Sequence, residues 1–234
     1  VATSMLRSVA GALLDPSREV RGAAAGCFAS FARRNAPQDL TKVIFERLLK
    51  SEQEFRTDDA QRNSYRVSLA RALWEVCRRC DDSMLETELK AAIAAKAFGL
   101  RYSSEQEVKT GWESLWTELC PSTSGGVARH CAEICAELAA SFAESVSRAD
   151  KVDTAKAVSA LSAQLEKVEP KRDWSKEEAV KALHAAVKAA VQTLPTFDGS
   201  GMLVKALADL VAVMHRRKRG EASDSAIPTE ASLG

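Results

Sequence analysis

The apolar positions of this chain recur every three to four residues, which is the period of an amphipathic helix. Short polar or proline-containing breaks, such as Asp15-Pro16 and the polar stretch 51–57, separate about ten segments of this kind. The clearest segments are 2–14, 17–33 and 58–79. The pattern therefore predicts an all-α fold.

Several short strings mark where these helices are expected to begin. Asp15 is a suitable cap for the second helix, with Pro16 at its first position. A Ser followed three residues later by Glu is a capping box, in which the two side chains satisfy free N–H groups of the first turn. The chain contains this spacing at Ser83/Glu86, Ser104/Glu107 and Ser175/Glu178. We expect a helix to start at each of them.

An internal similarity indicates that the helices form a repeat array. The stretches 15–24 and 103–112 both place Glu-Val and a basic residue in the first two turns of the second helix of a pair. The string 13–24, Leu-Leu-Asp-Pro-x-x-x-Val-Arg-x-x-Ala, resembles the HEAT repeat, whose Asp and Arg hold neighbouring repeats together. Asp15, Val20 and Arg21 occupy these repeat-stacking positions. We predict an α-solenoid of about five HEAT-like antiparallel helix pairs over 1–219, with 220–234 as a disordered tail.

The amino-acid composition is typical of a helical protein, and the charge and hydrophobicity argue against some classes of function. The 234 residues include 40 Ala but only 6% aromatics, and 33 basic residues balance 32 acidic ones. Balanced charge argues against a dedicated nucleic-acid binder, and no run approaches the ~20 apolar residues of a membrane span. The chain begins at Val1 without a secretory signal, so we expect a cytoplasmic segment of a longer protein, with the nucleus as a second location.

The residues that carry metal or nucleophilic chemistry do not form a recognisable site. Cys77-x-x-Cys80, His130, Cys131 and Cys135 include the ligand types of a zinc site, but both cysteine pairs fall within continuous helices without knuckle glycines. Buried thiols of a reduced intracellular protein, including Cys27 and Cys120, are the favoured interpretation. His184 and His215 also lack a nucleophile motif nearby. We predict no catalytic activity, cofactor or small-molecule substrate.

Two strings in the second half of the chain have an unusual composition. The first runs from residue 111 to 126, Gly-Trp-Glu-Ser-Leu-Trp-Thr-Glu-Leu-Cys-Pro-Ser-Thr-Ser-Gly-Gly, and the second from 172 to 178, Arg-Asp-Trp-Ser-Lys-Glu-Glu. Together they resemble the family of large HEAT-repeat proteasome-associated adaptors and scaffolds. That family has Trp-Glu-x-x-Trp, then Pro-x-Thr-x-Gly-Gly and a basic residue, here Arg129, and farther on Arg-x-Trp-x-x-Lys-Glu-Glu. The interval between the strings is shorter here, which leaves the helix pairing of 127–170 open.

The resemblance implies a non-catalytic segment from the C-terminal part of a long solenoid. Members of the family bind the 26S proteasome, contact its core and regulatory particles, and stabilise or regulate their association. The candidate partner-binding residues that it implies are Trp112, Glu113, Trp116, Gly125, Gly126 and Trp174. For Trp112 and Trp116, packing between repeats is the favoured alternative, and for Trp174 a staple contact at a helix start.

Two alternative functions, and two interpretations of one basic run, follow from the same sequence. Another HEAT or armadillo scaffold, such as a nuclear transport receptor or a phosphatase scaffold, has the same helical pattern. An enzyme on a helical bundle requires Cys/His metal chemistry. The basic run Arg216-Arg-Lys-Arg219 is interpreted first as a solvated helix end, which the helix dipole favours, and second as a nuclear localisation signal.

Overall fold

A computed structural model describes residues 2–31, 37–55, 57–79, 85–144, 147–167, 174–193 and 200–224. Within these ranges the chain forms ten α-helices and no β-strand, which confirms the predicted all-α class. The helices are α1 (Ala2–Ala12), α2 (Arg18–Phe31), α3 (Pro37–Glu54), α4 (Asp59–Cys77), α5 (Thr87–Leu100), α6 (Gln106–Leu119), α7 (Thr123–Glu144), α8 (Arg148–Leu165), α9 (Trp174–Thr193) and α10 (Ser200–Asp224).

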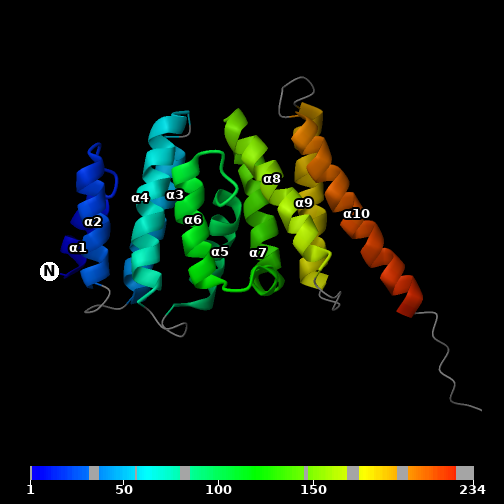
Figure 1. The fold of residues 1–234 in the computed structure, drawn as a ribbon, viewed down its shortest axis with the longest axis horizontal. Helices are drawn as coiled ribbons and strands as arrows, with labels where there is room; N and C mark the ends of the chain where they lie inside the picture. The colour runs from blue at the N-terminus through cyan, green and yellow to red at the C-terminus, as the bar shows by residue number, and fades with distance from the viewer. Residues whose placement is uncertain are drawn as a thin grey trace, which may run out of the picture.

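The helices stand side by side in a row from α1 and α2 at one end to α9 and α10 at the other (Figure 1). Consecutive helices pack together as the pairs α1–α2, α3–α4, α5–α6, α7–α8 and α9–α10. Helices two apart in the sequence also pack together: α1 on α3, α2 on α4, α4 on α6, α5 on α7, α7 on α9 and α8 on α10. Each pair therefore rests on the next, and residues 127–165 belong to the pair α7–α8.

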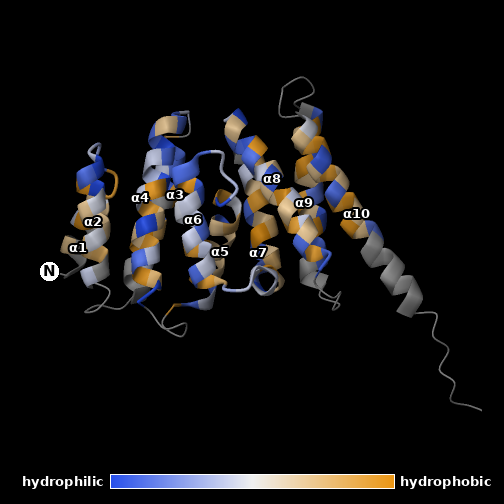
Figure 2. Cartoon of the chain, viewed as in Figure 1, coloured by the Kyte–Doolittle hydropathy of each residue, from blue (hydrophilic) through white to orange (hydrophobic). Residues whose placement is uncertain are grey.

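The core runs continuously through this row, because each amphipathic helix turns its apolar face toward its neighbours (Figure 2). In helix α5 the apolar residues are instead spread around the whole helix. It packs against α6, α7 and α8 and buries Ala91, Ala94, Ala95 and Ala97. Alanine side chains let three neighbouring helices approach α5 closely, so the amphipathic pattern disappears where a helix is covered on several sides.

Several predicted helix starts are wrong. Ser104 does not cap α6: its backbone N–H and its hydroxyl both donate to Asp153 Oδ2 on α8, at 2.7 and 3.0 Å. Helix α5 begins at Thr87, so Glu86 is its cap residue and not the third residue of a capping box. Ser175 lies inside α9, which begins at Trp174. Asp15 Oδ1 instead accepts a hydrogen bond from the Ser17 N–H at 2.8 Å, and α2 begins just after Ser17.

Two predicted breaks also differ from the structure. Helix α3 continues to Glu54 through part of the polar stretch 51–57, because Ser51 is fully buried and Glu52 forms an ion pair with Arg66. Helix α10 continues to Asp224, past the predicted end of the folded segment at 219. Residues 225–234 fall outside the described ranges. None of the helices in the described part of the chain has the length and apolar character that crossing a membrane requires.

Candidate functional site

The two tryptophans of the first string lie in the core of the row, on α6. Trp112 is 0% exposed and Trp116 is 1% exposed. The Trp116 ring packs edge-on against Phe98 of α5, with ring centroids 5.2 Å apart. Buried rings are not available to a partner, so in this structure Trp112 and Trp116 are packing residues and not contact residues.

Glu113 lies next to Trp112 in this string, and its side chain reaches the surface. Its Oε2 lies 2.6 Å from Arg101 Nε, and the Glu113 side chain remains 46% exposed. The Arg101 guanidinium in turn lies 5.2 Å from the centre of the Trp116 ring and 5.3 Å from that of Tyr102. Arg101 therefore covers the aromatic cluster by a cation–π contact, and Glu113 holds it there.

The two glycines at the start of α7 have different roles. A Cβ added to Gly126 would lie 2.6 Å from Cys120 Cβ and 2.9 Å from Trp116 Cζ2, so no other residue fits there without a shift. A Cβ on Gly125 would meet only the Ser122 side chain, at 3.3 Å, and Gly125 is exposed. Gly126 thus brings the start of α7 against α6, whereas Gly125 lies at the surface of the turn.

Arg21 connects α2 to α4 and is buried. Its Nη1 donates to the backbone carbonyls of Asp15 and Pro16 at 2.7 and 2.8 Å, and its Nε and Nη2 donate to Ser68 and Ser64 of α4 at 2.9 and 2.5 Å. The carbonyl of Asp15, and not its carboxylate, is therefore the group that Arg21 binds.

The role assigned to Val20 in repeat stacking is corrected. Val20 is 40% exposed and lies at the surface of α2. Of these two neighbouring residues, Arg21 is the one that hydrogen-bonds to α4.

The sequence analysis missed Arg62 of α4, which repeats the arrangement of Arg21. Arg62 is also buried, and its Nη1 donates to the carbonyl of Phe55 in the preceding turn at 3.1 Å. Each arginine lies four residues after the residue that precedes its helix, which is Ser17 for α2 and Asp58 for α4. The sequence signal that could have identified Arg62 is its position four residues after Asp58, which matches the position of Arg21 four residues after Ser17.

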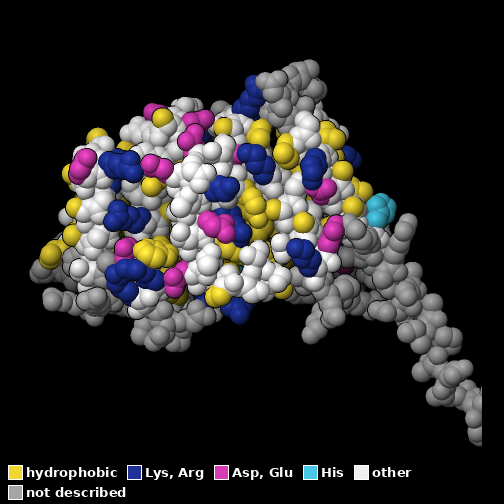
Figure 3. All heavy atoms as spheres, viewed as in Figure 1, with side chains coloured by type: hydrophobic (Ala, Val, Ile, Leu, Met, Phe, Trp, Pro, Cys, Tyr) yellow, Lys and Arg dark blue, Asp and Glu magenta, His cyan; other side chains and the backbone are white. Residues whose placement is uncertain are grey.

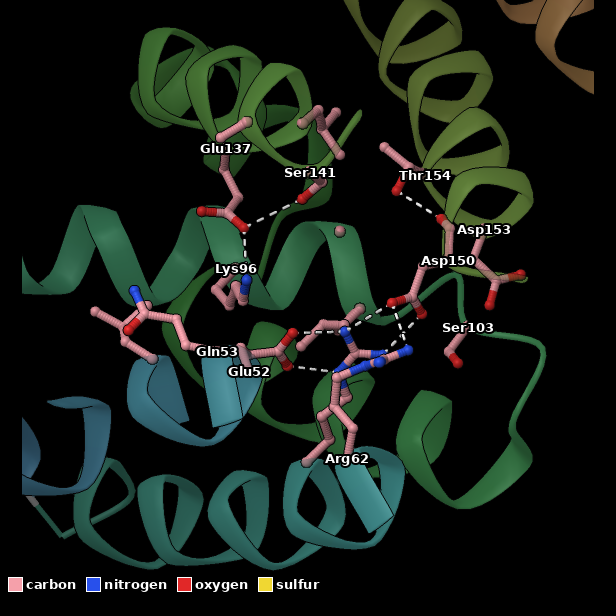
Figure 4. Close-up of a pocket in the computed structure, with 16 residues that line it drawn as sticks. Glu52, Gln53, Arg62, Lys96, Ser103, Glu137, Ser141, Asp150, Asp153 and Thr154 are labelled. Carbon is pink, nitrogen blue, oxygen red and sulfur yellow. Dashed lines mark hydrogen bonds and ion pairs between the residues drawn. The ribbon is translucent and has the colours of Figure 1, made fainter. Parts of the chain in front are cut away.

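Arg62 belongs to a network of ion pairs that joins α3, α4 and α8, and a separate ion pair beside it joins α5 to α7 (Figure 4). Asp150 of α8 accepts from Arg62 at 2.8 Å and from Arg66 at 2.9 Å. The other ion pairs are Arg62–Asp59 at 2.6 Å, Arg66–Glu52 at 2.6 Å and Lys96–Glu137 at 2.8 Å. These groups line a hollow of about 670 Å³ between α3, α4, α5, α7 and α8.

The charges in this hollow stabilise one another. Burial alone raises the pKa of the Glu52 carboxyl, but the hydrogen bonds and charge of Arg66 outweigh it and hold the pKa below its ordinary value of 4.5. Burial alone lowers the pKa of Lys96, but the charges of Glu137 and Glu52 raise it above 10.5. Glu52 and Lys96 are therefore ionised at neutral pH, and each pairs with a side chain of opposite charge.

The candidate metal ligands do not come together in the structure. In the described ranges no three His, Cys, Asp or Glu side chains are grouped as a metal site requires. Cys77, Cys120, Cys131 and Cys135 are buried, and Cys27 is exposed. Cys80 lies outside the described residues, and the side chains of Trp174 and of the basic run 216–219 are likewise not described.

His130 is buried at a kink in α7. Its backbone has non-helical angles, φ −113° and ψ 25°, and it is 3% exposed. Burial lowers the pKa of its imidazole below the ordinary value of 6.5; the charge of Glu133 opposes this shift, and those of Arg129 and Lys90 add to it. His130 is therefore neutral in the folded protein at neutral pH.

The burial of His130 predicts acid sensitivity. Below about pH 6.5 the unfolded chain binds a proton at this histidine that the folded chain binds only at lower pH, so stability falls as the pH is lowered through that range. His130→Gln is expected to remove this part of the dependence in urea unfolding between pH 7.5 and 5.5. His215→Gln, at an exposed histidine, is the control, and equal slopes for both variants would contradict the prediction.

One surface aromatic residue was also not predicted. Trp74 on α4 is half-buried, and the Arg78 guanidinium lies 4.3 Å from the centre of its ring.

On the face drawn in Figure 3, basic and acidic side chains are interspersed across the described helices. This face therefore has no large patch of one sign that would select a strongly charged partner.

Comparisons with known proteins add little to this geometry. No protein-family model matches the chain, and no curated protein matches it. Among solved structures, it is similar to the crystal structure of an engineered protein, with 16% sequence identity, a TM-score of 0.35, and 89% of this chain and 97% of that chain covered. A likeness at this level leaves the fold and function to be argued from the residues described above.

Proposed function

We propose that this chain is a non-catalytic scaffold segment built as an α-solenoid of HEAT-like helix pairs. The observation that carries the proposal is the packing order, in which each helix pair rests on the next along the row. A stack of this kind presents an extended surface of helix faces and turns, which is how repeat proteins bind other proteins. Binding would be spread over these surfaces.

The buried arginines support the repeat interpretation. Arg21 and Arg62 stand at the same position of α2 and α4, and both return to carbonyl groups of the preceding turn. The similar strings 15–24 and 103–112 also fall at the starts of α2 and α6, each the second helix of its pair. The same local device therefore recurs at corresponding places, as expected for a repeat.

For the partner, we propose the 26S proteasome, on the basis of the two strings that resemble the proteasome adaptor family. The exposed residues of the first string include Glu118 and Gly125, Glu113 is partly exposed, and the exposed Arg129 follows on α7. The proposed contact is therefore the surface around the turn between α6 and α7. In this proposal the buried rings of Trp112 and Trp116 do not contact the partner, but they pack beneath that surface and support it.

A binding experiment with charge-reversal variants tests the proposal. The purified chain is immobilised and exposed to purified 26S proteasome, and bound subunits are identified by mass spectrometry. We expect the unmodified chain to bind and the double variant Glu118→Lys/Arg129→Glu to bind much less, since both residues are exposed near the turn. The control is Arg71→Glu/Glu88→Lys, which changes exposed residues of α4 and α5.

The outcomes separate the scaffold from its partner. Equal loss of binding by both double variants would show that the proposed contact is not specific to the surface around the α6–α7 turn. A folded chain that binds no proteasome subunit contradicts the adaptor proposal and leaves a HEAT-like scaffold with another partner. Affinity for a small GTPase in its place would favour the nuclear transport receptor.

A further inference from the structure

The start of α8 is joined to the start of α4, although α8 belongs to the fourth helix pair and α4 to the second. Asp150 of α8 accepts hydrogen bonds from Arg66 Nη1 and Nη2 at 2.9 and 3.3 Å, and it lies 2.8 Å from Arg62 Nη2. The hydroxyl of Ser147 donates to Asp59 Oδ2 at 2.7 Å. Figure 1 places α5 and α6 between these two helices.

A contact between two helix pairs that are not neighbours restricts how the pair between them can move. In a stack where pairs touch only their neighbours, small rotations between pairs add up and the row is flexible. Two pairs that are not neighbours stay within hydrogen-bond distance only if the row between them keeps one curvature. The contact between Asp150 and the arginines of α4 therefore constrains the packing of α5 and α6 as well.

The burial of these charges makes the contact strong. The side chains of Arg62 and Arg66 are 3% and 6% exposed, and that of Asp150 is 20% exposed. Charge-assisted hydrogen bonds are stronger than neutral ones, and pairs away from bulk water are little screened by salt. By contrast Arg18 and Glu107, which join α2 to α6 at 3.3 Å, are 75% and 63% exposed.

Asp150 is also the one residue on α8 in the cluster formed by Glu52, Asp59, Arg62, Arg66 and Asp150. Arg66 keeps a bidentate contact with Glu52, at 2.6 and 2.7 Å, and Arg62 keeps Asp59 at 2.6 Å. Loss of the Asp150 charge would therefore break the link to α8, while each arginine retains an acidic partner near its own helix. The cluster is built so that the two halves of the row can separate without leaving an unpaired arginine.

We propose that Asp150 with Arg62 and Arg66 forms a clasp that fixes the curvature of the helical row. When the clasp is open, α7–α10 rotate relative to α1–α6, and the hollow between α3, α4, α5, α7 and α8 widens. The clasp is a conformational device of the fold. It goes beyond the proposed scaffold function and does not depend on the identity of the partner.

The test compares Asp150→Asn with Glu107→Gln, which removes a charge from the exposed contact across α4. Small-angle X-ray scattering reports the radius of gyration, and hydrogen exchange with mass spectrometry reports protection along each helix. We expect Asp150→Asn to enlarge the radius and to raise exchange in the first turns of α8 by about tenfold. Exchange in α1, α2 and the middle of α9 is expected to stay unchanged, and Glu107→Gln is expected to behave as the unmodified chain.

Further outcomes decide against the proposal or in its favour. An unchanged radius and unchanged exchange in folded Asp150→Asn would overturn the clasp. If Asp150→Asn does not fold, Ser147→Ala is measured in the same way. It removes the hydroxyl that donates to Asp59 and that also accepts from the Asp150 N–H as the cap of α8. Because loss of the cap acts on α8 alone, raised exchange at the start of α4 supports the clasp, and unchanged exchange there overturns it.

Discussion

Replacing Trp112 by alanine is expected to lower the free energy of unfolding by about 3–5 kcal/mol. The Trp112 side chain is fully buried on α6, which packs against both α4 and α5. Its removal loses the transfer free energy of a large aromatic ring and leaves a cavity that these three helices fill only in part. Urea unfolding followed by circular dichroism measures the change.

The control for Trp112→Ala is Ser114→Ala, which changes an exposed residue two positions along the same helix. A surface substitution of this kind is expected to stay within about 0.5 kcal/mol. If Trp112→Ala had an equally small effect on stability and abolished partner binding, the ring would be a contact residue in solution. That result would support the interpretation of Trp112 as a partner contact, which the burial of its ring argues against.

The substitution Gly126→Ala is expected to destabilise the protein by about 2–3 kcal/mol, although alanine is the better helix former. The added methyl group would lie 2.6 Å from Cys120 Cβ and 2.9 Å from both Cys120 Sγ and Trp116 Cζ2. Relief requires α7 to move away from α6 or the Trp116 ring to shift in a filled core. Thermal and urea unfolding both report this loss.

Gly125→Ala provides a matched control one residue earlier in the same turn of α7. A Cβ at Gly125 meets the short Ser122 side chain at 3.3 Å, which can rotate away, and Gly125 is exposed. This variant is expected to be neutral or slightly stabilising, since alanine favours the helix. Equal destabilisation by both variants would show that the helix start, and not the contact with Trp116, requires glycine.

Most of the secondary structure was predictable from the sequence, because it depends on residues close to one another along the chain. The apolar period and the breaks placed α1, α2 and α4 within a few residues of their observed bounds. The shared Glu-Val-basic strings correctly marked the second helices of two pairs. Arg21 was identified as a residue at the contact between helices, and the structure places it between α2 and α4.

Details that depend on distant residues were not predictable. Ser104 has the sequence of a helix cap, but Asp153, which lies 49 residues later, takes both of its donors. Arg62 and Arg66 have the pattern of a solvated helix face until Asp150 and Glu52 are brought beside them. Trp112 and Trp116 fit an interface as well as a core, and only the packing of α6 on α4 and α5 buries them.

The sequence by itself thus determined that this protein is a series of amphipathic helices with short connections. Helix formation follows from the spacing of apolar side chains and from turn residues within one or two turns. The tertiary structure alone decided which charges are paired, which glycine has no room for a side chain, and that α8 reaches α4. These features depend on distances between segments that lie up to 89 residues apart in the chain, and no local pattern encodes them.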